Sequence, residues 1–372
     1  MTTDPTSGPV RFLQVGDLAA GNRLVDLSLR AVQADPDRPS GLTKGHRACR
    51  GCGEALAARG VLDAAWRATG GRLVTVNATG CLEVFSSPYP ESAWKVPWLH
   101  SLFGNAPAVA SGVAAALHVT GQDDVRVLAQ GGDGGTLDIG FGTLSGMFER
   151  NDDVLYVCYD NQAYMNTGVQ RSGATPPAAR TATTPVVHGR GGNDMRPPKD
   201  APRIAMAHGI PYVATATIAD LHDLEAKVTR AMGMRGARYL LVLVPCPLGW
   251  GSASDEAVRL ARLATQTGLF PLLEAVDGEV VATTPIRRRE PVEAYLRPQK
   301  RFAHLFTPEN DPGNVEVLAA IQAGADRTIA RYRLDRDDDA PDDDFDLPDD
   351  PDDPDDPDAP DDGPGDTGGG LP

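Results

Sequence analysis

Four of the five cysteines lie at points where the sequence pattern predicts loops rather than the middle of a strand or helix. Cys49 and Cys52 stand two residues apart in GHRACRGCGEALAAR, just ahead of an alanine-rich helical run. Cys81 follows one β-rich run, and Cys246 ends another. Four thiolates can ligate either a [4Fe–4S] cluster or a zinc ion in a closed tetrahedral site. The spacing C-x2-C-x28-C-x164-C does not distinguish these two centres.

Other chemistry for cysteine and histidine fits the sequence less well. A redox dithiol of the thioredoxin type is disfavoured because no Trp precedes the CxxC motif. Cys158 lies inside the apolar run VLYVCYD, where a free cysteine is expected to pack as a small buried hydrophobe. The histidines show neither HxH nor HExxH spacing, so they do not predict a zinc site of those types.

A glycine-rich turn forms a second candidate site. The β-rich run VRVLAQ leads directly into GGDGG and then into a helical pattern. Gly132, Gly134 and Gly135 allow the backbone to approach a phosphate, and the following helix N-terminus favours the negative charge of that phosphate. Asp133 supplies a hard carboxylate oxygen of the kind that Mg²⁺ binds. Taken alone, this turn is more typical of an ordinary connection between a strand and a helix than of a phosphate site.

The next β-rich run supplies a second metal ligand. VLYVCYD leads to Asn161, which stands 28 residues after Asp133. In open α/β folds, ligands bind at the carboxyl ends of the parallel strands, where neighbouring strand ends lie side by side. An Asp and an Asn at two such ends therefore predict a metal ion that bridges a diphosphate.

The elements that position these residues alternate between β-rich and helical patterns from residue 41 to about residue 250. Strands are expected over residues 72–78, 125–131, 154–160, 212–218 and 238–246, and helices over 105–121, 135–150 and 219–236. The strands are apolar throughout, which is typical of a parallel sheet covered on both faces. We therefore expect an α/β fold with a doubly wound parallel sheet. A long polar loop over residues 167–200 is typical of a segment that is either functional or disordered.

Four regions are expected along the chain. They are an N-terminal arm (1–40), the α/β domain (41–253), a helical C-terminal extension (254–334) and an acidic tail (335–372). The tail contains 18 Asp and one Arg, a charge of about −17, so of the net charge of −16 it leaves residues 1–334 with about +1. Such a Pro-rich, acidic segment cannot bury enough apolar surface to fold, so we expect a disordered, solubilising appendage. A regulatory role, in which the tail mimics an acidic partner, is the alternative.

Composition excludes several classes of function. The near-neutral body lacks the basic footprint of a nucleic-acid-binding protein. No run of eighteen apolar residues occurs, so no membrane partner is expected. The first residues lack the pattern of a signal peptide, which favours a cytoplasmic protein with reduced thiols. Metal binding, catalysis or packing, more than disulfide formation, is then the expected role of the cysteines.

The motifs, read in chain order, resemble one known family. They are CRGCGEAL, NATGCLEV, WKVPWLHSLFGNAPAVASG, GGDGGTLDIGFGTLSGMFERNDDVLYVCYDNQAYMNTGVQRSGATP and LVPCPLGW. Over about residues 41–310 the chain is similar to the β subunit of pyruvate:ferredoxin oxidoreductase, which binds thiamine diphosphate. The first forty residues and the acidic tail lie outside this resemblance.

The resemblance implies a role for each matched residue. Asp133 and Asn161 would ligate Mg²⁺ together with the backbone carbonyl of Ala163, and relatives carry either Thr or Asn at the second position. Asn166, in YMNTG, would reach the reactive thiazolium end of the cofactor. His100 would lie near the cofactor, as a structural residue or as a proton carrier. Further cofactor contacts are implied for Gly132, Gly134, Gly135, Cys52, Gly80 and Cys81.

In this family the four cysteines, Cys49, Cys52, Cys81 and Cys246, ligate a [4Fe–4S] cluster. The implied reaction converts pyruvate, CoA and oxidised ferredoxin into acetyl-CoA, CO₂ and reduced ferredoxin. The electrons left by decarboxylation on thiamine must depart, which favours an iron–sulfur centre over zinc at the four thiols.

The resemblance also implies that one catalytic residue lies on another subunit. The glutamate that activates the cofactor's aminopyrimidine ring comes from the α subunit, so the chain is expected to be catalytically incomplete without its α and γ/δ partners. Three alternatives stay open. They are the same chemistry on a branched-chain 2-oxo acid or oxalate, a non-redox thiamine decarboxylase with structural zinc, and a non-catalytic scaffold that binds diphosphate.

Overall fold

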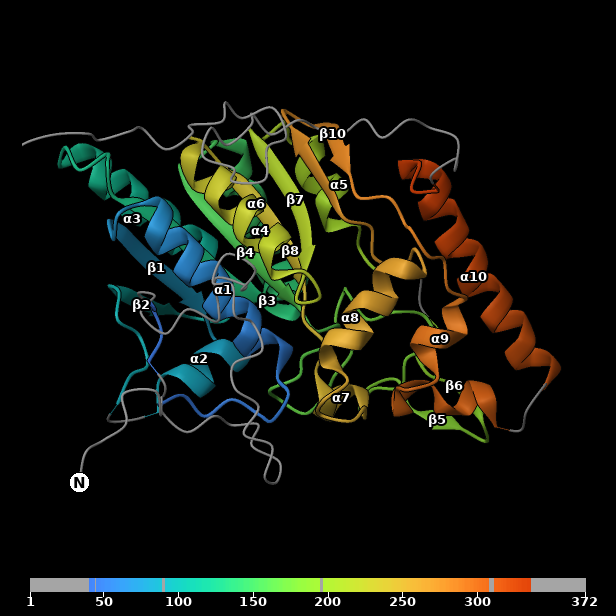
Figure 1. Ribbon diagram of the computed structural model, residues 1–372. Helices are drawn as coiled ribbons and strands as arrows, with labels where there is room; N and C mark the ends of the chain where they lie inside the picture. Colours follow the sequence, from blue (N-terminus) through green and yellow to red (C-terminus); the bar gives the residue numbers. More distant parts are fainter. Residues whose placement is uncertain (1–39, 44, 89–90, 195–196, 308–310, 336–372) are drawn as a thin grey trace, which may run out of the picture. The chain divides into compact units, whose positions relative to one another are not determined.

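The apolar runs expected to form strands lie at the centre of an eight-stranded sheet (Figure 1). Its strands are β1 Leu73–Ala78, β2 Trp98–Ser101, β3 Arg126–Gly132, β4 Val154–Asp160, β7 Tyr212–Thr217, β8 Arg238–Leu243, β9 Leu273–Val276 and β10 Glu279–Thr283. The spatial order is β10-β9-β7-β8-β4-β3-β1-β2. Six of these strands run parallel, while β9 and β10 pair antiparallel at one edge. The α/β class predicted from the sequence is confirmed.

The computed structural model describes residues 40–43, 45–88, 91–194, 197–307 and 311–335. The N-terminal arm up to residue 39 and the acidic tail from residue 336 onward therefore lie outside the described residues. None of the described helices combines the length and the apolarity that crossing a bilayer requires.

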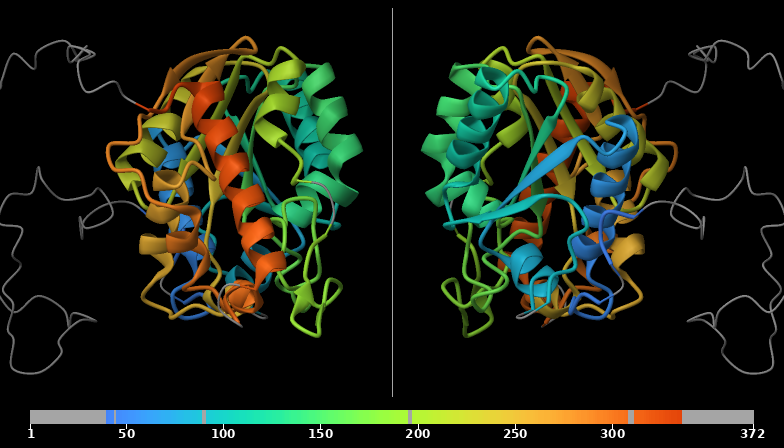
Figure 2. Two further views of the ribbon diagram at one scale, coloured as in Figure 1. Left: turned by 90° about the vertical axis from the view of Figure 1, so that its right-hand side faces the viewer. Right: turned by 90° about the vertical axis from the view of Figure 1, so that its left-hand side faces the viewer.

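Helices cover both faces of the sheet, as strands buried on both sides require (Figure 2). One face carries α1 Gly53–Ala68 and α6 Leu221–Gly233, which pack over β-strand side chains such as Leu128 and Val157. The opposite face carries α3 Ala106–Val119, α4 Phe141–Glu149 and α5 Ala201–Ala207. All seven residues of β4 are buried, as expected for a central strand.

The segment after residue 254, which we expected to be helical, also extends the sheet. Its helices are α8 Ala257–Gln266, α9 Val292–Leu296, the 3₁₀ turn η3 Lys300–Phe306 and α10 Pro312–Tyr332. Between α8 and α9, the dipeptide Asp277-Gly278 joins β9 to β10, and both of its residues have positive φ. Asp-Gly is a strong signal for a two-residue hairpin turn, and it identifies these strands in retrospect.

Several short elements depart from the expected pattern. The helix expected over 135–150 is divided, with a π-helical turn Gly135–Ile139 before α4. Two short helices, α2 Cys81–Ser86 and α7 Pro247–Trp250, were not expected. The long loop contains a small hairpin of β5 Val186–Val187 and β6 Arg190–Gly191.

Candidate functional site

The predicted site residues follow four adjacent strands of the sheet. Asp133 comes directly after β3, and Asn161 comes directly after β4. Cys81 lies three residues after the end of β1, and Cys246 lies three residues after the end of β8. In the sheet these strands stand in the order β8-β4-β3-β1, so the two cysteines flank the two oxygen ligands. Neighbouring strands lie about 4.8 Å apart, which places the four strand ends within about 15 Å. The topology thus brings the sulfur and oxygen ligands to one edge.

A cavity of about 80 Å³ lies at this edge. The predicted residues that line it are Gly80, Cys81, Gly132, Asp133, Gly134, Gly135, Asn161, Ala163 and Asn166. Because one cavity holds both Cys81, a candidate cluster ligand, and the candidate magnesium ligands, the sulfur of Cys81 is not remote from the carboxylate of Asp133. Asn166 is exposed at this cavity, unlike Asp133, Asn161 and Ala163, which are buried.

The glycines of the GDGG turn differ in the space that surrounds each Cα atom. A Cβ atom on Gly134 would lie 2.5 Å from Cε1 of Tyr164, and one on Gly135 would lie 3.1 Å from the carbonyl oxygen of Phe103. These two glycines therefore let Tyr164 and Phe103 close over the turn, where their rings stack with centroids 5.7 Å apart. A Cβ on Gly132 would meet no protein atom within 4 Å, so the space beside it is open.

A buried glutamate that we did not predict connects the two halves of the site. Glu54, in the first turn of α1, accepts a hydrogen bond from Nδ2 of Asn161 (3.3 Å) and another from the backbone N–H of Leu82 (3.2 Å). Burial raises the pKa of Glu54 to about 7, against the effect of these two donors. The Glu54 carboxyl group lies in the first turn of α1, which follows Cys52, and it accepts from α2, which begins at Cys81. It thus connects the starts of these two helices to Asn161, a candidate magnesium ligand.

Two further buried carboxyl groups accompany Glu54. Burial, with the charge of nearby Asp160, raises the pKa of Asp133, while a hydrogen bond from Oγ of Ser172 opposes this shift. Burial also raises the pKa of Asp160 to about 7, opposed by the N–H of Gln162 and by the charge of Arg301. Several carboxyl groups in one poorly solvated region favour binding of a cation, which would stabilise their charged forms. The oxygen donors therefore suit a hard metal ion.

The turn after β4 is held from the C-terminal segment. Gln162 adopts a positive φ of 69°, which is strained for a residue with a side chain. Its side-chain oxygen accepts hydrogen bonds from Arg301 (2.6 Å) and from Tyr295 (3.4 Å). Trp250 donates from Nε1 to the carbonyl oxygen of Asn161 (2.8 Å), and the Arg301 guanidinium lies 4.0 Å from the Trp250 ring centre. Residues far along the chain thus fix the backbone of the candidate metal-binding turn.

The four thiols lie within electrostatic reach of one another. Burial, together with the nearby charges of Glu54 and Cys246, raises the pKa of Cys52 to about 12. Burial, Glu54 and the other three cysteines all raise the pKa of Cys81. Burial, Glu54 and Cys49 likewise raise the pKa of Cys246. Within the described part of the chain, no three His, Cys, Asp or Glu side chains are arranged to hold a metal ion.

Glycines allow the close approach of the sulfur-bearing loops. Gly51, with φ of 73°, packs so tightly that a Cβ atom would lie 1.9 Å from the carbonyl oxygen of Ser254. Gly53 donates its backbone N–H to the carbonyl oxygen of Pro245 (3.2 Å). A Cβ on Gly249 would lie 2.1 Å from the sulfur of Met165, a residue of the cavity wall. The CxxC loop and the Cys246 turn are therefore packed together against this wall.

The long loop after Asn166 is fastened to the helix that follows GDGG. Asp138, in the π-helical turn, accepts hydrogen bonds from the hydroxyl of Tyr164 (3.1 Å), the N–H of Gly173 (2.8 Å) and the ammonium group of Lys199 (2.8 Å). Together with the bond from Ser172 to Asp133, these contacts hold the loop over the cavity. The functional role that its length suggested is thus consistent with its position.

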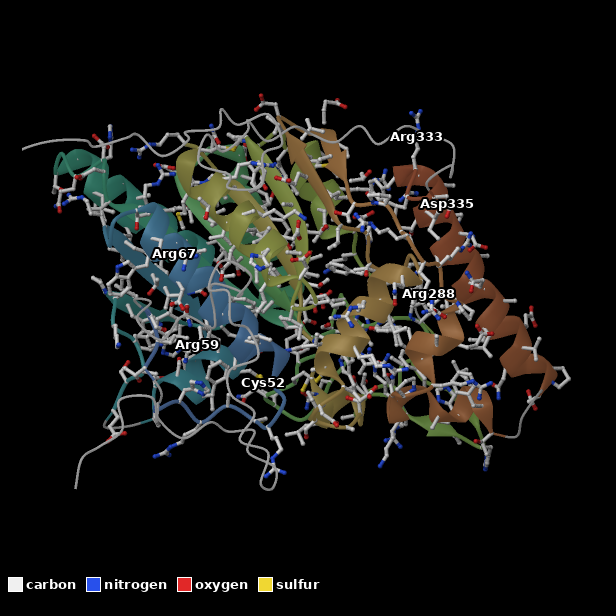
Figure 3. The ribbon with its side chains drawn as sticks, in the orientation of Figure 1. Cys52, Arg59, Arg67, Arg288, Arg333 and Asp335 are labelled. Atoms are coloured by element: carbon white, nitrogen blue, oxygen red, sulfur yellow. The ribbon has the colours of Figure 1, made fainter. Side chains whose placement is uncertain are left out.

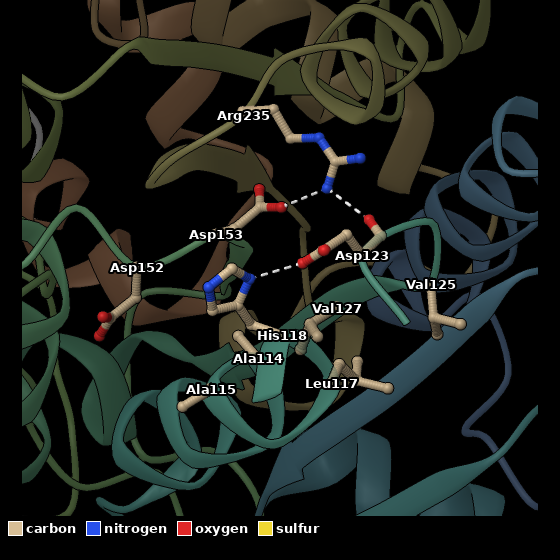
Figure 4. Close-up of a pocket in the computed structure, with 10 residues that line it drawn as sticks. All are labelled: Ala114, Ala115, Leu117, His118, Asp123, Val125, Val127, Asp152, Asp153 and Arg235. Carbon is tan, nitrogen blue, oxygen red and sulfur yellow. Dashed lines mark hydrogen bonds and ion pairs between the residues drawn. The ribbon is translucent and has the colours of Figure 1, made fainter. Parts of the chain in front are cut away.

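A larger cavity, of about 480 Å³, contains none of the predicted site residues (Figure 4). Its polar side chains include His118, paired with Asp123 at 2.7 Å, and Arg235, paired with Asp153 at 2.8 Å. It lies where β3 and β4 begin, at the opposite end of the strands from Asp133. Ligands of parallel α/β sheets bind at the carboxyl ends, so we assign the functional site to the smaller cavity.

The remaining site expectations have mixed outcomes. Cys158 is fully buried, which confirms its role in packing. His100 contacts the cavity only indirectly, through a hydrogen bond between Nε2 and the hydroxyl of Thr79 (2.8 Å). Glu54 could have been identified from the sequence, because it is a carboxylate in the otherwise apolar start of the alanine-rich helix after CxxCG. Ser172 and Asp138 carry no such signal, since their roles depend on how the loop folds back.

Comparison with known proteins gives three findings. Residues 78–242 match the family model described as "Thiamine pyrophosphate enzyme, C-terminal TPP binding domain". "Pyruvate synthase subunit PorB" of Methanosarcina barkeri is 50% identical over 294 residues, which cover 79% of this chain and 97% of that protein. "Ketoisovalerate oxidoreductase subunit VorB" of Pyrococcus abyssi is 40% identical, covering 74% of this chain and 87% of that protein.

Among solved structures, one similar chain belongs to 2-oxoglutarate:ferredoxin oxidoreductase from Magnetococcus marinus, solved with 2-oxoglutarate, coenzyme A and succinyl-CoA bound. It is 26% identical, with a TM-score of 0.48, and the match covers 59% of this chain and 78% of that chain.

The packing of Tyr164 on Gly134 generates a testable prediction. We expect Gly134→Ala to displace the Tyr164 ring and to weaken binding of thiamine diphosphate with Mg²⁺ by about 10-fold, since overpacking costs about 1–3 kcal/mol. Gly142→Ala in α4 is the matched control, because a Cβ there meets nothing within 4 Å. Calorimetric titration of both variants measures the effect, and equal affinities would contradict this account of the turn.

Proposed function

This chain belongs to the family of pyruvate synthase PorB subunits, and we propose that pyruvate is its substrate. It is a subunit of a thiamine diphosphate-dependent 2-oxoacid:ferredoxin oxidoreductase. The proposed reaction converts pyruvate and CoA into acetyl-CoA and CO₂ while ferredoxin is reduced. We further propose that it acts in the cytoplasm, in a hetero-oligomer with α and γ/δ subunits.

The observation that carries this proposal is that one cavity wall joins the candidate sulfur ligands, the four cysteines, to the candidate oxygen ligands, Asp133, Asn161 and Ala163. Cys81 lines the same cavity as Asp133 and Asn161, and Glu54 connects the two sets by hydrogen bonds. An enzyme that decarboxylates a 2-oxo acid on thiamine and passes the electrons onward needs an electron acceptor beside its cofactor. A decarboxylase without a redox step has no need of four thiols at this position.

The donor chemistry suits the groups that we assign. Asp133, Asn161 and the carbonyl oxygen of Ala163 would hold Mg²⁺, which prefers hard oxygen ligands. Gly132, Gly134 and Gly135 would approach the diphosphate with their backbone. Cys49, Cys52, Cys81 and Cys246 would hold a [4Fe–4S] cluster. Its irons would stabilise the thiolates of Cys52, Cys81 and Cys246, whose pKa values burial raises. Thiamine supplies the electron sink for decarboxylation when it is bound.

The residues of this chain contribute positioning more than proton transfer. Asp133 and Asn161 are buried, so their ligand atoms are fixed before the cofactor arrives. Tyr164 and Phe103 cover the GDGG turn, where they would exclude water from a bound diphosphate. Asn166 lies exposed on the cavity, where its amide can hydrogen-bond a substrate held at the reactive end of the cofactor.

A branched-chain 2-oxo acid is the second candidate substrate. The Pyrococcus abyssi relative named for ketoisovalerate is 40% identical, while the Methanosarcina barkeri relative named for pyruvate is 50% identical. The higher identity favours pyruvate. Rates of the assembled complex with pyruvate, 2-ketoisovalerate and oxalate distinguish these substrates.

Metal content tests the proposed cluster against structural zinc. We expect the anaerobically purified complex to be brown and to contain about four iron and four sulfide ions for the site in this chain, beyond any held by its partners. Cys246→Ser should lower the iron content by about that amount, whereas Cys158→Ala should leave it unchanged, because Cys158 is buried in the core. Zinc in place of iron, or equal losses in both variants, would exclude the cluster.

The requirement for an α subunit gives a separate prediction. We expect the isolated chain to bind thiamine diphosphate with Mg²⁺ but to reduce a viologen dye with pyruvate at less than about 1% of the rate of the assembled complex. The reason is that the glutamate that activates the cofactor in this family lies on another subunit, and general acid–base groups contribute about 10²–10⁴-fold. Dye reduction assayed with and without the partners decides this, and full activity of the isolated chain would refute it.

A further inference from the structure

We propose that the hydroxyl groups of Ser172 and Thr175 position the ligands of the candidate magnesium site and make that site selective for Mg²⁺ over larger cations. Both residues belong to a four-residue segment of the long loop, residues 172–175, which we call the hydroxyl clamp. The inference rests on the proposed function. It assigns a positioning role to two side chains that would act on the metal only through its ligands.

Ser172 orients the carboxylate of Asp133. Its Oγ donates a hydrogen bond to Oδ2 of Asp133, and the two residues are only 0% and 1% exposed. The same hydroxyl oxygen accepts a hydrogen bond from the backbone N–H of Ala174 (3.2 Å). Rotation of the carboxylate would break the bond from Ser172 and leave a buried hydroxyl unpaired, which costs free energy. The direction in which Asp133 presents its oxygens is therefore set before a metal ion binds.

Thr175 acts on the turn that carries the other candidate ligands. Its Oγ1 donates to the carbonyl oxygen of Gln162 (2.8 Å) and accepts from the backbone N–H of Ser172 (2.9 Å). Gln162 stands between Asn161 and Ala163, and its positive φ is a strained conformation that persists only where neighbouring groups hold it. The hydrogen bond from Thr175 thus stabilises the turn that presents both of these ligands.

The clamp itself is held firmly by the rest of the chain. Gly173 donates its N–H to Oδ2 of Asp138 (2.8 Å), and its carbonyl oxygen accepts from the N–H of Lys199 (2.9 Å). Asn193 donates from Nδ2 to the carbonyl oxygen of Thr175 (2.8 Å). A Cβ atom on Gly173 would lie 2.7 Å from Oδ1 of Asp138, so the close approach depends on glycine. Because these contacts fix the clamp, its hydroxyls need no ordering when the metal binds.

The clamp joins the ends of two neighbouring strands, β3 and β4, by one hydroxyl each. Mg²⁺ demands near-ideal octahedral geometry at about 2.0–2.1 Å, whereas Ca²⁺ accepts a larger number of oxygens in a flexible arrangement. Ligands that are fixed from both turns at once favour the cation with the stricter geometry. Loss of either hydroxyl should therefore weaken the binding of Mg²⁺ more than the binding of Ca²⁺.

The test measures metal binding without catalysis. The assembled complex is freed of metal and supplied with excess thiamine diphosphate. Electron paramagnetic resonance of free Mn²⁺ then measures the binding of that ion, and displacement of Mn²⁺ gives the affinities for Mg²⁺ and Ca²⁺. We expect Ser172→Ala to weaken Mg²⁺ binding about 10–100-fold and Ca²⁺ binding less. Thr175→Val should act in the same direction, whereas Thr175→Ser keeps the hydroxyl and should bind Mg²⁺ like the parent complex.

A matched control and a second readout separate positioning from general damage. Thr267→Val is the control, because Thr267 is equally buried and its Oγ1 donates to the carbonyl oxygen of Leu263 (2.8 Å) at the end of α8. Iron content is the second readout. The clamp bonds to the oxygen half of the site, whereas Cys52, at the start of α1 (Figure 3), belongs to the sulfur half. Ser172→Ala should therefore keep the iron content of the parent complex.

The outcomes distinguish this inference from the proposed function. A parent complex that binds no Mg²⁺ with thiamine diphosphate would refute the proposed function, and the clamp with it. Where the parent complex does bind, unchanged Mg²⁺ affinity in Ser172→Ala would overturn the clamp alone. Equal losses for Mg²⁺ and Ca²⁺, or an equal loss in Thr267→Val, would do the same. If Ser172→Ala does not assemble, the comparison of Thr175→Val with Thr175→Ser decides the question by the same criteria.

Discussion

The arrangement of the site depends on one buried side chain, Glu54. Its carboxyl group accepts one hydrogen bond from the side chain of Asn161 and another from the backbone N–H of Leu82. A carboxyl group without solvent is costly unless its surroundings compensate it. Here the compensation comes from both halves of the site at once, from the turn after β4 and from the start of α2. Because removal of either donor would leave a buried oxygen unpaired, the sulfur-bearing loops and the candidate metal-binding turn cannot separate without a cost in free energy.

Close packing of backbone segments also holds the two halves of the site together. Gly51, Gly53 and Gly249 let the CxxC loop and the Cys246 turn pack against each other and against the cavity wall, at distances that no Cβ atom permits. Arg301 donates to the side chain of Gln162, whose backbone has a positive φ, and Trp250 donates to the carbonyl oxygen of Asn161 just before it. The site is thus built from the carboxyl ends of adjacent strands and stabilised by residues that are distant in the sequence.

The sequence supported the central sheet and most of the site, for physical reasons. Runs such as VLYVCYD are apolar at every position, and the Asp and Asn that follow two of these runs are polar where the fold places ligands. The sequence did not reveal contacts that need the folded chain. Ser172 reaches Asp133, and Lys199 reaches Asp138, only because the long loop returns over the cavity. The β9–β10 hairpin was missed although Asp277-Gly278 signalled it.

The account's central claim is that an iron cluster held by four cysteines lies beside the diphosphate site. Anomalous diffraction at the iron edge, from anaerobic crystals of the assembled complex, tests this most directly. We expect a peak enclosed by the sulfur atoms of Cys49, Cys52, Cys81 and Cys246, on the Glu54 side of the cofactor. A peak at the zinc edge alone, or iron found only on other subunits, would contradict the account.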